Sequence, residues 1–332
     1  MALIDPDSVT SAAILGMGSV GSGWAALLLA RGIHVRAYDT GAQAEKTAHM
    51  LIEGAWPSLV ELGFTELESP PFGNLEFFDS YEDVLKSVEV VFENVPENLE
   101  LKQKVMGVTD ANTSATTPIL SSAGGISPTA MQEACKSPER LVVVHPFNPS
   151  HLIPLVEIVP GEQTSKEILG WAREFSKRLG KKPITLEREM PGHMVNRLQF
   201  ALVREAISCL VDGVASAEDI DTAVRFGLAP RWLLQGGLQT VAMAGGPGGM
   251  FGILNHAGPA MEKWWEPRGS VKITPGVKEK MVAAAQELSE GAGFEDWVAW
   301  RDAHLVSLFS FQAQADADRP GKSIGRTPGG TQ

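Results

Sequence analysis

Six residues near the amino terminus constrain the fold of this chain more than any other feature. The hexapeptide Gly16-Met17-Gly18-Ser19-Val20-Gly21 follows the apolar run Ala12–Leu15, which predicts a strand, and precedes the apolar, helix-compatible stretch Trp24–Ala30. A second predicted strand, over Ile33–Tyr38, ends on Asp39, 18 residues after the last glycine. A strand, a glycine-rich turn, a helix, a strand and an acid in this order predict a βαβ unit.

The glycine pattern predicts a dinucleotide site. The first glycine permits a tight turn, the second lets the backbone approach a pyrophosphate, and the third lets helix and strand pack closely. The helix N-terminus then offers free N–H groups to the phosphates. Asp39 would accept hydrogen bonds from the ribose hydroxyls and repel a 2′-phosphate, and Thr40-Gly41 offers no arginine to hold one. We therefore predict NAD, bound by residues 16–21 and Asp39; the alternative is a glycine-rich turn in another kind of α/β protein.

Length, charge and cysteine content limit the remaining classes. A chain of 332 residues suits two domains. Its net charge of −12 argues against nucleic acid and anionic membranes as partners. Cys135 and Cys209 lie far apart and fit no metal-binding spacing, so we expect reduced thiols, a cytoplasmic location and no metal. The first residues lack a basic segment, and no segment reads as membrane-spanning, so we expect neither a signal peptide nor a membrane anchor.

The chain alternates predicted strands and helices up to about residue 187. Most strand candidates are short and rich in Val and Ile, as strands covered on both faces are. They lie at Ala12–Gly16, His34–Tyr38, Leu75–Phe78, Val88–Phe92, Pro118–Ser121, Leu141–Val144, Leu155–Val159 and Pro183–Leu186. This alternation predicts a Rossmann-type doubly wound sheet over residues 1–190, with ligands at the carboxyl ends of its strands.

The pattern changes after Met190-Pro191-Gly192. From Met194 to Val211, apolar residues recur at three- and four-residue steps, which predicts one long amphipathic helix. Further helices are expected over 216–226, 232–242, 259–265, 275–290 and 294–313. We therefore predict an α/β domain followed by an all-helical domain over 191–315 and a disordered tail over 316–332. The Met194–Val211 helix shows no broad polar face, which favours a homodimer built by helix packing.

A histidine and a glutamate form the candidate catalytic pair. His145 directly follows the apolar run Leu141–Val144, at the carboxyl end of a predicted strand. Glu157 lies inside the apolar run Leu155–Val159, where a carboxylate is costly unless it has a partner. A carboxylate fixes the tautomer of an imidazole and stabilises the imidazolium that forms when it takes a proton. Taken singly, His145 also fits a turn histidine, and Glu157 an edge-strand glutamate facing water.

These segments carry a family resemblance. Residues 141–149, 153–160 and 192–198, together with the glycine hexapeptide, resemble the 3-hydroxyacyl-CoA dehydrogenase superfamily. The runs Val95–Lys102 and Val195–Gln199 are similar, almost residue for residue, to the branch of L-gulonate 3-dehydrogenase (λ-crystallin) and carnitine dehydrogenase. The resemblance extends from about residue 12 to residue 252. It implies an NAD-dependent dehydrogenase with its site between two domains.

The resemblance implies a role for each catalytic candidate. His145 would be the general base for alcohol oxidation or the acid for ketone reduction, and Glu157 would orient it. Asn196 would hydrogen-bond the reacting oxygen or the histidine; a helix cap is its alternative role.

Three charged residues match binding positions of the family. Glu97 and Lys102 match positions that contact the cofactor, as Asp39 does. Arg231 matches an arginine of the hydroxy-acid branch that would clamp a substrate carboxylate with its planar fork. An interdomain ion pair is the alternative role for Arg231.

One position departs from the family. A serine-rich stretch there ends on a serine that hydrogen-bonds the substrate oxygen, whereas this chain has Ser121-Ser122-Ala123-Gly124-Gly125, with Gly124 at the serine position. Loss of one donor to a developing oxyanion typically costs roughly 3–4 kcal/mol of barrier. Ser122 or a water would then substitute, or the freed volume would admit a bulkier substrate, or the reaction would differ from ordinary alcohol oxidation. Ser121 and Ser122 also fit plain loop residues.

The expected function is NAD-dependent interconversion of a small hydroxy and keto or imine substrate that carries a carboxylate. Ser122, Gly124 and Arg231 are the predicted substrate-binding residues. One alternative is an NAD-binding, crystallin-like protein with lost or altered catalysis, which the glycine at 124 favours. A second is a 3-hydroxyacyl-CoA dehydrogenase proper. The acidic segment that contains Glu61, Glu66 and Glu68 argues against it, because it offers no basic cluster for the phosphates of CoA.

Overall fold

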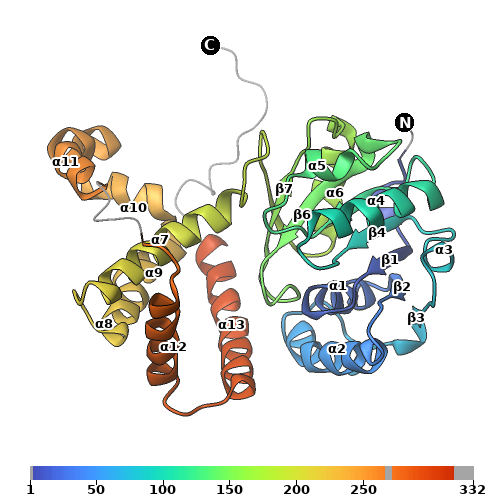
Figure 1. Cartoon of the computed structure of the whole chain (residues 1–332), viewed down its shortest axis with the longest axis horizontal. Helices are drawn as coiled ribbons and strands as arrows, with labels where there is room; N and C mark the ends of the chain where they lie inside the picture. Colours follow the sequence, from blue (N-terminus) through green and yellow to red (C-terminus); the bar gives the residue numbers. More distant parts are fainter. Residues whose placement is uncertain (1–2, 266–270, 318–332) are drawn as a thin grey trace. The chain divides into compact units, whose positions relative to one another are not determined.

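The chain folds into an α/β unit and a helical unit. The computed structural model describes residues 3–265 and 271–317 (Figure 1). The two compact units meet between Leu198 and Gln199, inside helix α7 (Met194–Val211). The division therefore falls within the first helix of the second half, whereas the sequence places a domain boundary before that helix, at residue 190. Each unit is described by itself.

The first unit is built on one eight-stranded sheet of order β3-β2-β1-β4-β5-β6-β7-β8. All eight predicted strands are present. Their bounds are β1 Ser11–Leu15, β2 His34–Tyr38, β3 Leu75–Phe77, β4 Val90–Glu93, β5 Ile119–Ser121, β6 Leu141–Pro146, β7 Leu155–Val159 and β8 Lys182–Thr185. Neighbouring strands are parallel except for β6 and β7, which run antiparallel. The Rossmann-type architecture predicted from the sequence is confirmed.

Helices cover both faces of this sheet. The unit contains α1 Ser19–Ala30, α2 Ala44–Glu61, α3 Tyr81–Val84, α4 Leu99–Asn112, α5 Pro128–Gln132 and α6 Lys166–Arg178. One core cluster joins α1, α2 and α6 to residues such as Ala12 and Ile14 of β1. Two others lie among α3, α4 and α5, and Ala13 and Leu15 of β1 belong to one of them. Because alternate residues of one strand enter opposite cores, the strands read as unbroken apolar runs.

The second unit is helical throughout its described residues, as predicted. Helix α7 has the predicted bounds Met194–Val211. The others are α8 Ala217–Thr222, a π-helical segment Ala223–Leu228, α9 Ala229–Gln235, α10 Gly237–Ala244, α11 Gly249–Trp265, α12 Pro275–Ser289 and α13 Phe294–Ala317 (Figure 1). The Ser216 side chain caps α8 by accepting a hydrogen bond from the Asp219 N–H.

Three predictions for this unit need correction. The helix expected over 232–242 is interrupted at Gly236, whose φ of 78° is left-handed and ends α9. Helix α11 begins at Gly249 and runs through Pro259, where the sequence predicts the start of a helix. The tail expected from residue 316 is helical at Asp316 and Ala317, which end α13, and residues 318–332 lie outside the described part of the chain.

The two units differ in how much apolar surface they bury. Among the described residues of the helical unit, the buried apolar side chains are Ile207, Ala284 and Val306. Many large apolar side chains there are exposed, among them Phe226, Leu238, Phe251, Trp264 and Phe294.

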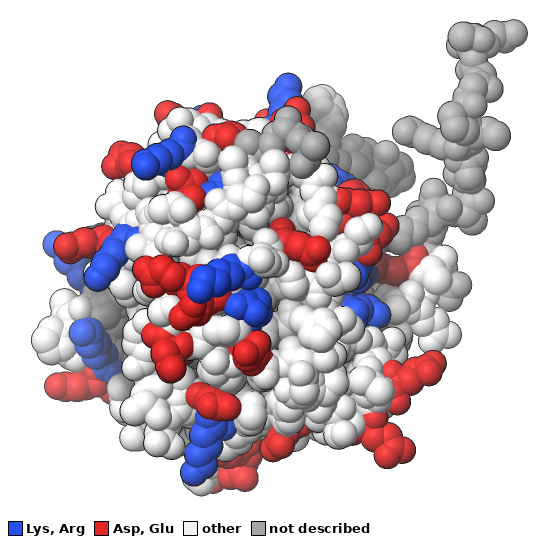
Figure 2. Space-filling view, turned by 90° about the vertical axis from the view of Figure 1, so that its right-hand side faces the viewer, with Lys and Arg blue, Asp and Glu red and all other residues white. Residues whose placement is uncertain are grey.

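Three features of the described residues bear on possible partners. Lys and Arg lie interspersed with Asp and Glu on the face shown in Figure 2, which carries no continuous basic patch. None of the helices in the described ranges is long and apolar enough to cross a membrane. Within the same ranges, no cluster of three or more His, Cys, Asp or Glu residues is arranged to hold a metal ion.

Candidate active site

The glycine hexapeptide forms the turn between β1 and α1. Gly16 has a φ of +94°, and a Cβ there would lie 2.7 Å from the Asn94 carbonyl oxygen. A Cβ at Gly21 would lie 1.9 Å from the Gly16 carbonyl oxygen, so helix and strand touch backbone to backbone. A Cβ at Gly18 would meet nothing within 4 Å, so the space beside this residue is open. The backbone at Gly16 and Gly21 thus makes a tight turn and a close packing contact, and the approach of a pyrophosphate at Gly18 stays a prediction.

The start of α1 fits an anionic ligand. Its N-cap is Gly18, which has no side chain to satisfy the first N–H groups, and its first turn holds no acidic residue. Asp39 ends β2 beside it: Oδ2 accepts a hydrogen bond from the Met17 N–H at 2.6 Å, and Oδ1 accepts one from the Gly41 N–H at 2.8 Å. The carboxylate is therefore held at the turn with lone pairs left for hydroxyl donors. These residues fit the pyrophosphate and ribose of NAD.

His145 and Glu157 are direct partners across the antiparallel strands β6 and β7. Residues opposite each other in such a pair project to the same face. The Nδ1 of His145 lies 3.0 Å from Oε2 of Glu157, and both side chains are buried. Because β8 forms the edge of the sheet beyond β7, Glu157 is not an edge-strand residue, and its exposed fraction is 0%.

The second oxygen of Glu157 holds the start of α7. Oε1 accepts hydrogen bonds from the Met194 N–H at 3.1 Å and the Val195 N–H at 2.9 Å. Burial raises the pKa of Glu157, but the hydrogen bonds from His145 and Val195 outweigh burial, and the pKa lies below its ordinary value. The carboxylate thus stays ionised, which favours the proton of a neutral His145 on Nδ1 and leaves Nε2 as the basic nitrogen.

Gly124 lies against that basic nitrogen. A Cβ at Gly124 would lie 3.4 Å from Nε2 of His145 and 3.7 Å from Nδ2 of Asn196. Asn196 donates from Nδ2 to the Gly124 carbonyl oxygen at 2.8 Å. The sequence predicts that Asn196 bonds the histidine, the reacting oxygen or a helix end. In the structure its Nδ2 bonds the Gly124 backbone, and its contact with the reacting oxygen stays a prediction.

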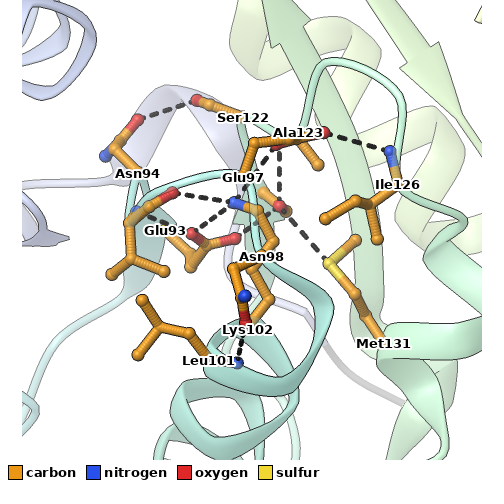
Figure 3. A network of polar contacts seen from close by, with 12 residues as sticks. Glu93, Asn94, Glu97, Asn98, Leu101, Lys102, Ser122, Ala123, Ile126 and Met131 are labelled. Carbon is orange, nitrogen blue, oxygen red and sulfur yellow. Dashed lines mark hydrogen bonds and ion pairs between the residues drawn. The ribbon is translucent and has the colours of Figure 1, made fainter. Parts of the chain in front are cut away.

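A buried ion pair supports this turn from below (Figure 3). Lys102 donates from Nζ to Oε1 of Glu93 at 2.8 Å and to the Val95 carbonyl oxygen at 3.1 Å. The Lys102 side chain is 1% exposed, so it offers almost no accessible surface to a cofactor, and its predicted cofactor contact stays a prediction. Glu97 lies 3.8 Å from the same ammonium group, and its Oε1 accepts from the Gly125 N–H at 2.9 Å and from the next N–H at 3.1 Å. Lys102 therefore supports Glu97, which is the more accessible of the two.

Ser122 does not replace the missing serine. Its hydroxyl donates to Oδ1 of Asn94 at 2.7 Å (Figure 3). The same oxygen accepts a hydrogen bond from Nε1 of Trp24 at 3.1 Å. Since the single hydroxyl proton is already used, Ser122 offers no donor to a substrate oxygen. Ser121 is likewise internal, because its hydroxyl hydrogen-bonds Oε2 of Glu93. The substrate-binding role predicted for Ser122 is therefore not supported by the geometry.

Arg231 belongs to the helical unit. It lies in α9, and its Nε donates to the Gly227 carbonyl oxygen at 3.0 Å. The side chain is exposed, and it makes no ion pair within the described ranges. Its predicted carboxylate contact stays a prediction.

Sequence reasoning missed two buried basic residues. His193 directly precedes α7; its ring is fully buried, and the ring centroid lies 5.5 Å from that of His145. Lys181 donates from Nζ to the carbonyl oxygens of Ser150 and Ile153, in the segment that joins β6 and β7, and burial lowers its pKa to about 7. Each lies in a short stretch with glycine and proline nearby, and neither stretch has an apolar periodicity that would indicate burial.

Family models cover most of the chain. The 3-hydroxyacyl-CoA dehydrogenase NAD binding domain matches residues 11–190, and the C-terminal domain of the same family matches residues 192–294. The chain belongs to the 3-hydroxyacyl-CoA dehydrogenase family. It is accordingly an oxidoreductase whose sheet unit is the NAD-binding domain of that family.

Individual members of this family share most of the chain. An L-carnitine dehydrogenase of Streptomyces coelicolor is 39% identical over 306 residues, which are 92% of this chain and 96% of the relative. An L-carnitine dehydrogenase of Pseudomonas putida is 35% identical over 296 residues, or 89% of this chain and 92% of the relative.

Solved structures of the family show the same architecture. A 5-formyl-3-hydroxy-2-methylpyridine 4-carboxylic acid 5-dehydrogenase, described as an NAD⁺-dependent dismutase, has a TM-score of 0.80 at 29% identity, covering 92% of this chain and 99% of its own. The (S)-3-hydroxybutyryl-CoA dehydrogenase of Ralstonia eutropha has a TM-score of 0.63 at 28% identity, covering 84% and 95%. The carnitine dehydrogenase branch indicated by the sequence motifs is thus consistent with the relatives found.

Proposed function

We propose that this protein interconverts a hydroxyl and a ketone on a small, carboxylate-bearing substrate, with NAD as the redox partner, His145 as the proton-transfer residue and Glu157 as its orienting partner. The observation that carries the proposal is the buried contact of 3.0 Å between Nδ1 of His145 and Oε2 of Glu157. It leaves Nε2 directed at the open position of Gly124, where a Cβ would lie within 3.4 Å.

The residues of the chain handle the proton. In the oxidation direction, Nε2 of His145 takes the proton of the substrate hydroxyl, and in the reduction direction it returns a proton to the ketone oxygen. Glu157 stabilises the imidazolium that forms on His145. The N–H groups at the start of α7 hold the Glu157 carboxylate, which in turn holds the His145 ring in place. Residues 16–21 and Asp39 would hold NAD, which would supply the hydride-transfer chemistry.

A free hydroxy acid of the carnitine type fits better than a CoA ester. The relatives with 39% and 35% identity are named L-carnitine dehydrogenase, and carnitine is a 3-hydroxy acid. Arg231 offers a planar fork for the substrate carboxylate. The segment from Glu61 to residue 71 is acidic and offers no cationic cluster to the phosphates of CoA.

Gly124 favours a second candidate, an NAD-binding protein with lost or altered catalysis. The side-chain donor that the family places there is missing, and Ser122 does not supply it. In the primary proposal, the free volume beside Nε2 accepts a bulkier substrate group, and a second hydrogen of the Asn196 amide remains available as a donor.

We also propose that the protein forms a homodimer through its helical unit. Large exposed side chains such as Leu238 at 81%, Phe251 at 78% and Trp264 at 73% leave the unit with few buried apolar residues of its own. Apolar surface of this extent marks an interaction face. Because no other partner is indicated by charge or motif, a second copy of the chain is the occupant that we propose.

A substrate panel tests the function. Purified protein is incubated with NAD and L-carnitine, 3-hydroxybutyrate or (S)-3-hydroxybutyryl-CoA, and NADH formation is followed. We expect turnover with a free hydroxy acid, and we expect His145→Ala to abolish it while NAD affinity is kept. Turnover of the CoA ester alone would support the family's acyl-CoA activity instead.

A glycine-to-serine variant separates the remaining alternative. If the natural protein binds NAD but turns over no substrate of the panel, and Gly124→Ser creates activity, the protein has lost catalysis. If the natural protein is active and Gly124→Ser lowers turnover of bulky substrates, the free volume at residue 124 serves the substrate.

A further inference from the structure

The turn beside His145 is flexible by sequence and yet held at three successive residues. Ala123-Gly124-Gly125 follows β5 and contains no side chain larger than a methyl group. The Ala123 carbonyl oxygen accepts from Nε2 of His193 at 3.1 Å, and the Gly124 carbonyl oxygen accepts from Asn196 at 2.8 Å. The Gly125 N–H donates to Glu97 at 2.9 Å. Because glycine loses the most conformational freedom when it is fixed, these bonds oppose a large entropic tendency to move.

His193 is built into this turn at a cost to its own backbone. It is 0% exposed, and its φ of 48° lies in the left-handed region, which is unfavourable for a residue with a side chain. Its neighbour Gly192 is also left-handed, with a φ of 76°. A residue without a β-carbon would adopt the conformation of residue 193 more easily. The imidazole therefore has a role that outweighs the strain.

The hydrogen bond defines the state of the ring. A carbonyl oxygen only accepts, so Nε2 of His193 carries the proton, and Nδ1 is the acceptor of a neutral imidazole. Nδ1 is buried and has no hydrogen-bond partner among the described residues. The groups around the ring are His145 from β6, Glu157 from β7 and Glu97 from the β4–α4 connection. Burial, and then His145, lower the pKa of His193 more than the Ala123 carbonyl and the two carboxylates raise it.

We propose that His193 is a positioning residue that locks the Ala123–Gly125 backbone to the start of α7 and so gives the open space at Gly124 a fixed shape beside Nε2 of His145. The link is structural: His193 and Asn196 both come from the start of α7, and the same turn of helix is bonded to Glu157. Residues 193–196 therefore position both the Glu157 carboxylate and the Ala123–Gly125 turn. The importance of this turn for turnover rests on the proposed role of His145.

Two substitutions at residue 193 separate the hydrogen bond from the packing. His193→Phe keeps a ring of similar size and removes the N–H donor, whereas His193→Gln keeps a side-chain N–H. Displacement of groups by about 1 Å at a reaction centre can cost on the order of 100-fold in rate. For His193→Phe we expect a fall in kcat of about 10- to 100-fold with little change in KM for NAD, and for His193→Gln we expect most of the activity to return.

Amide hydrogen exchange gives a readout that does not depend on catalysis. In the peptide that spans residues 121–127, His193→Phe should speed exchange about tenfold or more relative to the natural protein, and His193→Gln should restore slow exchange. Unchanged exchange in His193→Phe, or equal damage in both variants, overturns the proposal. If His145→Ala leaves turnover intact, the proposed function fails, and the exchange result still decides whether His193 holds the turn.

A measurement on the natural protein remains decisive if His193→Phe does not fold. Nitrogen NMR with ¹⁵N-labelled histidine reports tautomer and charge directly. We expect His193 to carry its proton on Nε2 and to be neutral at pH 7, because its pKa lies below the ordinary value for histidine. A His193 that carries its single proton on Nδ1 contradicts the hydrogen bond on which the proposal depends.

Discussion

The sheet unit of this chain buries most of its large apolar side chains, whereas the helical unit exposes many of its own. In the sheet unit, helices cover both faces, and strand β1 sends alternate residues into separate cores. In the helical unit, three apolar side chains are buried among the described residues, and the largest ones are exposed. The sheet unit thus buries its apolar side chains by its own packing, whereas the helical unit leaves a large apolar surface exposed, which favours the proposed association.

The position of the candidate chemistry follows this difference. His145, Glu157, Gly124 and Asn196 all belong to the unit that ends at Leu198. Reacting groups must be held within a fraction of an ångström, which a densely packed sheet provides.

The largest expected effect tests whether the chemistry depends on the sheet unit. Glu157→Gln removes the charge that orients His145 and offers an amide in place of the second acceptor oxygen. By analogy with neutralised carboxylates of catalytic histidines, kcat should fall about 10³- to 10⁴-fold. NAD affinity, measured by calorimetry, should change little.

The matched control for this substitution is Glu100→Gln. Glu100 is exposed in the first turn of α4. The kcat of the Glu100→Gln protein should match that of the natural protein. A Glu157→Gln protein with natural turnover would show that the buried pair is structural.

A pair of leucines compares the packing of the two units. Leu27 of α1 is 0% exposed, and Leu27→Ala should lower the free energy of unfolding by about 3 kcal/mol through transfer and cavity terms. Leu238 of α10 is 81% exposed, and Leu238→Ala should cost less than about 0.5 kcal/mol in a dilute monomer.

Urea unfolding at several protein concentrations tests whether a second copy of the chain covers Leu238. The cost of Leu238→Ala should grow as concentration rises, because a second copy then covers the leucine. A cost that does not depend on concentration would mean that the exposed leucine has no partner in solution.

A charge on the exposed helical surface should weaken the dimer. Phe251→Asp introduces a carboxylate at a side chain that is 78% exposed in one copy. If the partner covers this position, desolvation of the charge should raise the dissociation constant by about 100-fold, or about 2.7 kcal/mol. Sedimentation equilibrium measures the change.

Met50→Asp in the sheet unit is the control. Met50 is 63% exposed on α2, and its replacement should leave association unchanged. Equal weakening by both variants would indicate that the sheet unit also takes part in the interface.

The smallest effect is the pH dependence from Glu157. Burial raises the pKa of this carboxyl, but its hydrogen bonds hold the pKa below the ordinary value of 4.5. A carboxylate of this kind stabilises the fold fully above its unfolded pKa, and the contribution disappears as pH falls through the lower folded pKa.

The natural protein should therefore lose stability below about pH 4.5 more steeply than Glu157→Gln does. Urea unfolding between pH 7 and pH 3.5 checks this. Parallel curves for the two proteins would contradict the lowered pKa.

The sequence predicted the elements whose burial dictates their composition. The buried strands β1, β4, β5 and β6 were identifiable because strands covered on both faces are mostly apolar, whereas β2, β3 and β8 are partly exposed. The short helices α3 and α5 were missed, since four or five residues show no helical period. The break at Gly236 and the early start of α11 at Gly249 depend on glycine conformations that the residue type permits but does not require.

The candidate site was predicted in part. The pairing of His145 with Glu157 follows from a buried carboxylate that needs a partner, and the structure places the two side chains in contact. The partner of Asn196 and the occupied hydroxyl of Ser122 depend on the positions of single atoms in the turn after β5. His193 was missed because a lone histidine beside a proline and a glycine has no pattern that marks it as buried.

The register between β6 and β7 has a consequence for protein engineering. The two residues of the proposed proton-transfer pair lie 12 residues apart, and their partners at the start of α7 also precede residue 199. A chimera spliced after Leu198 would therefore inherit the complete acid–base machinery from one parent and its helices from another. Such hybrids would let new substrates be explored by exchange of a module, with the chemistry carried over intact.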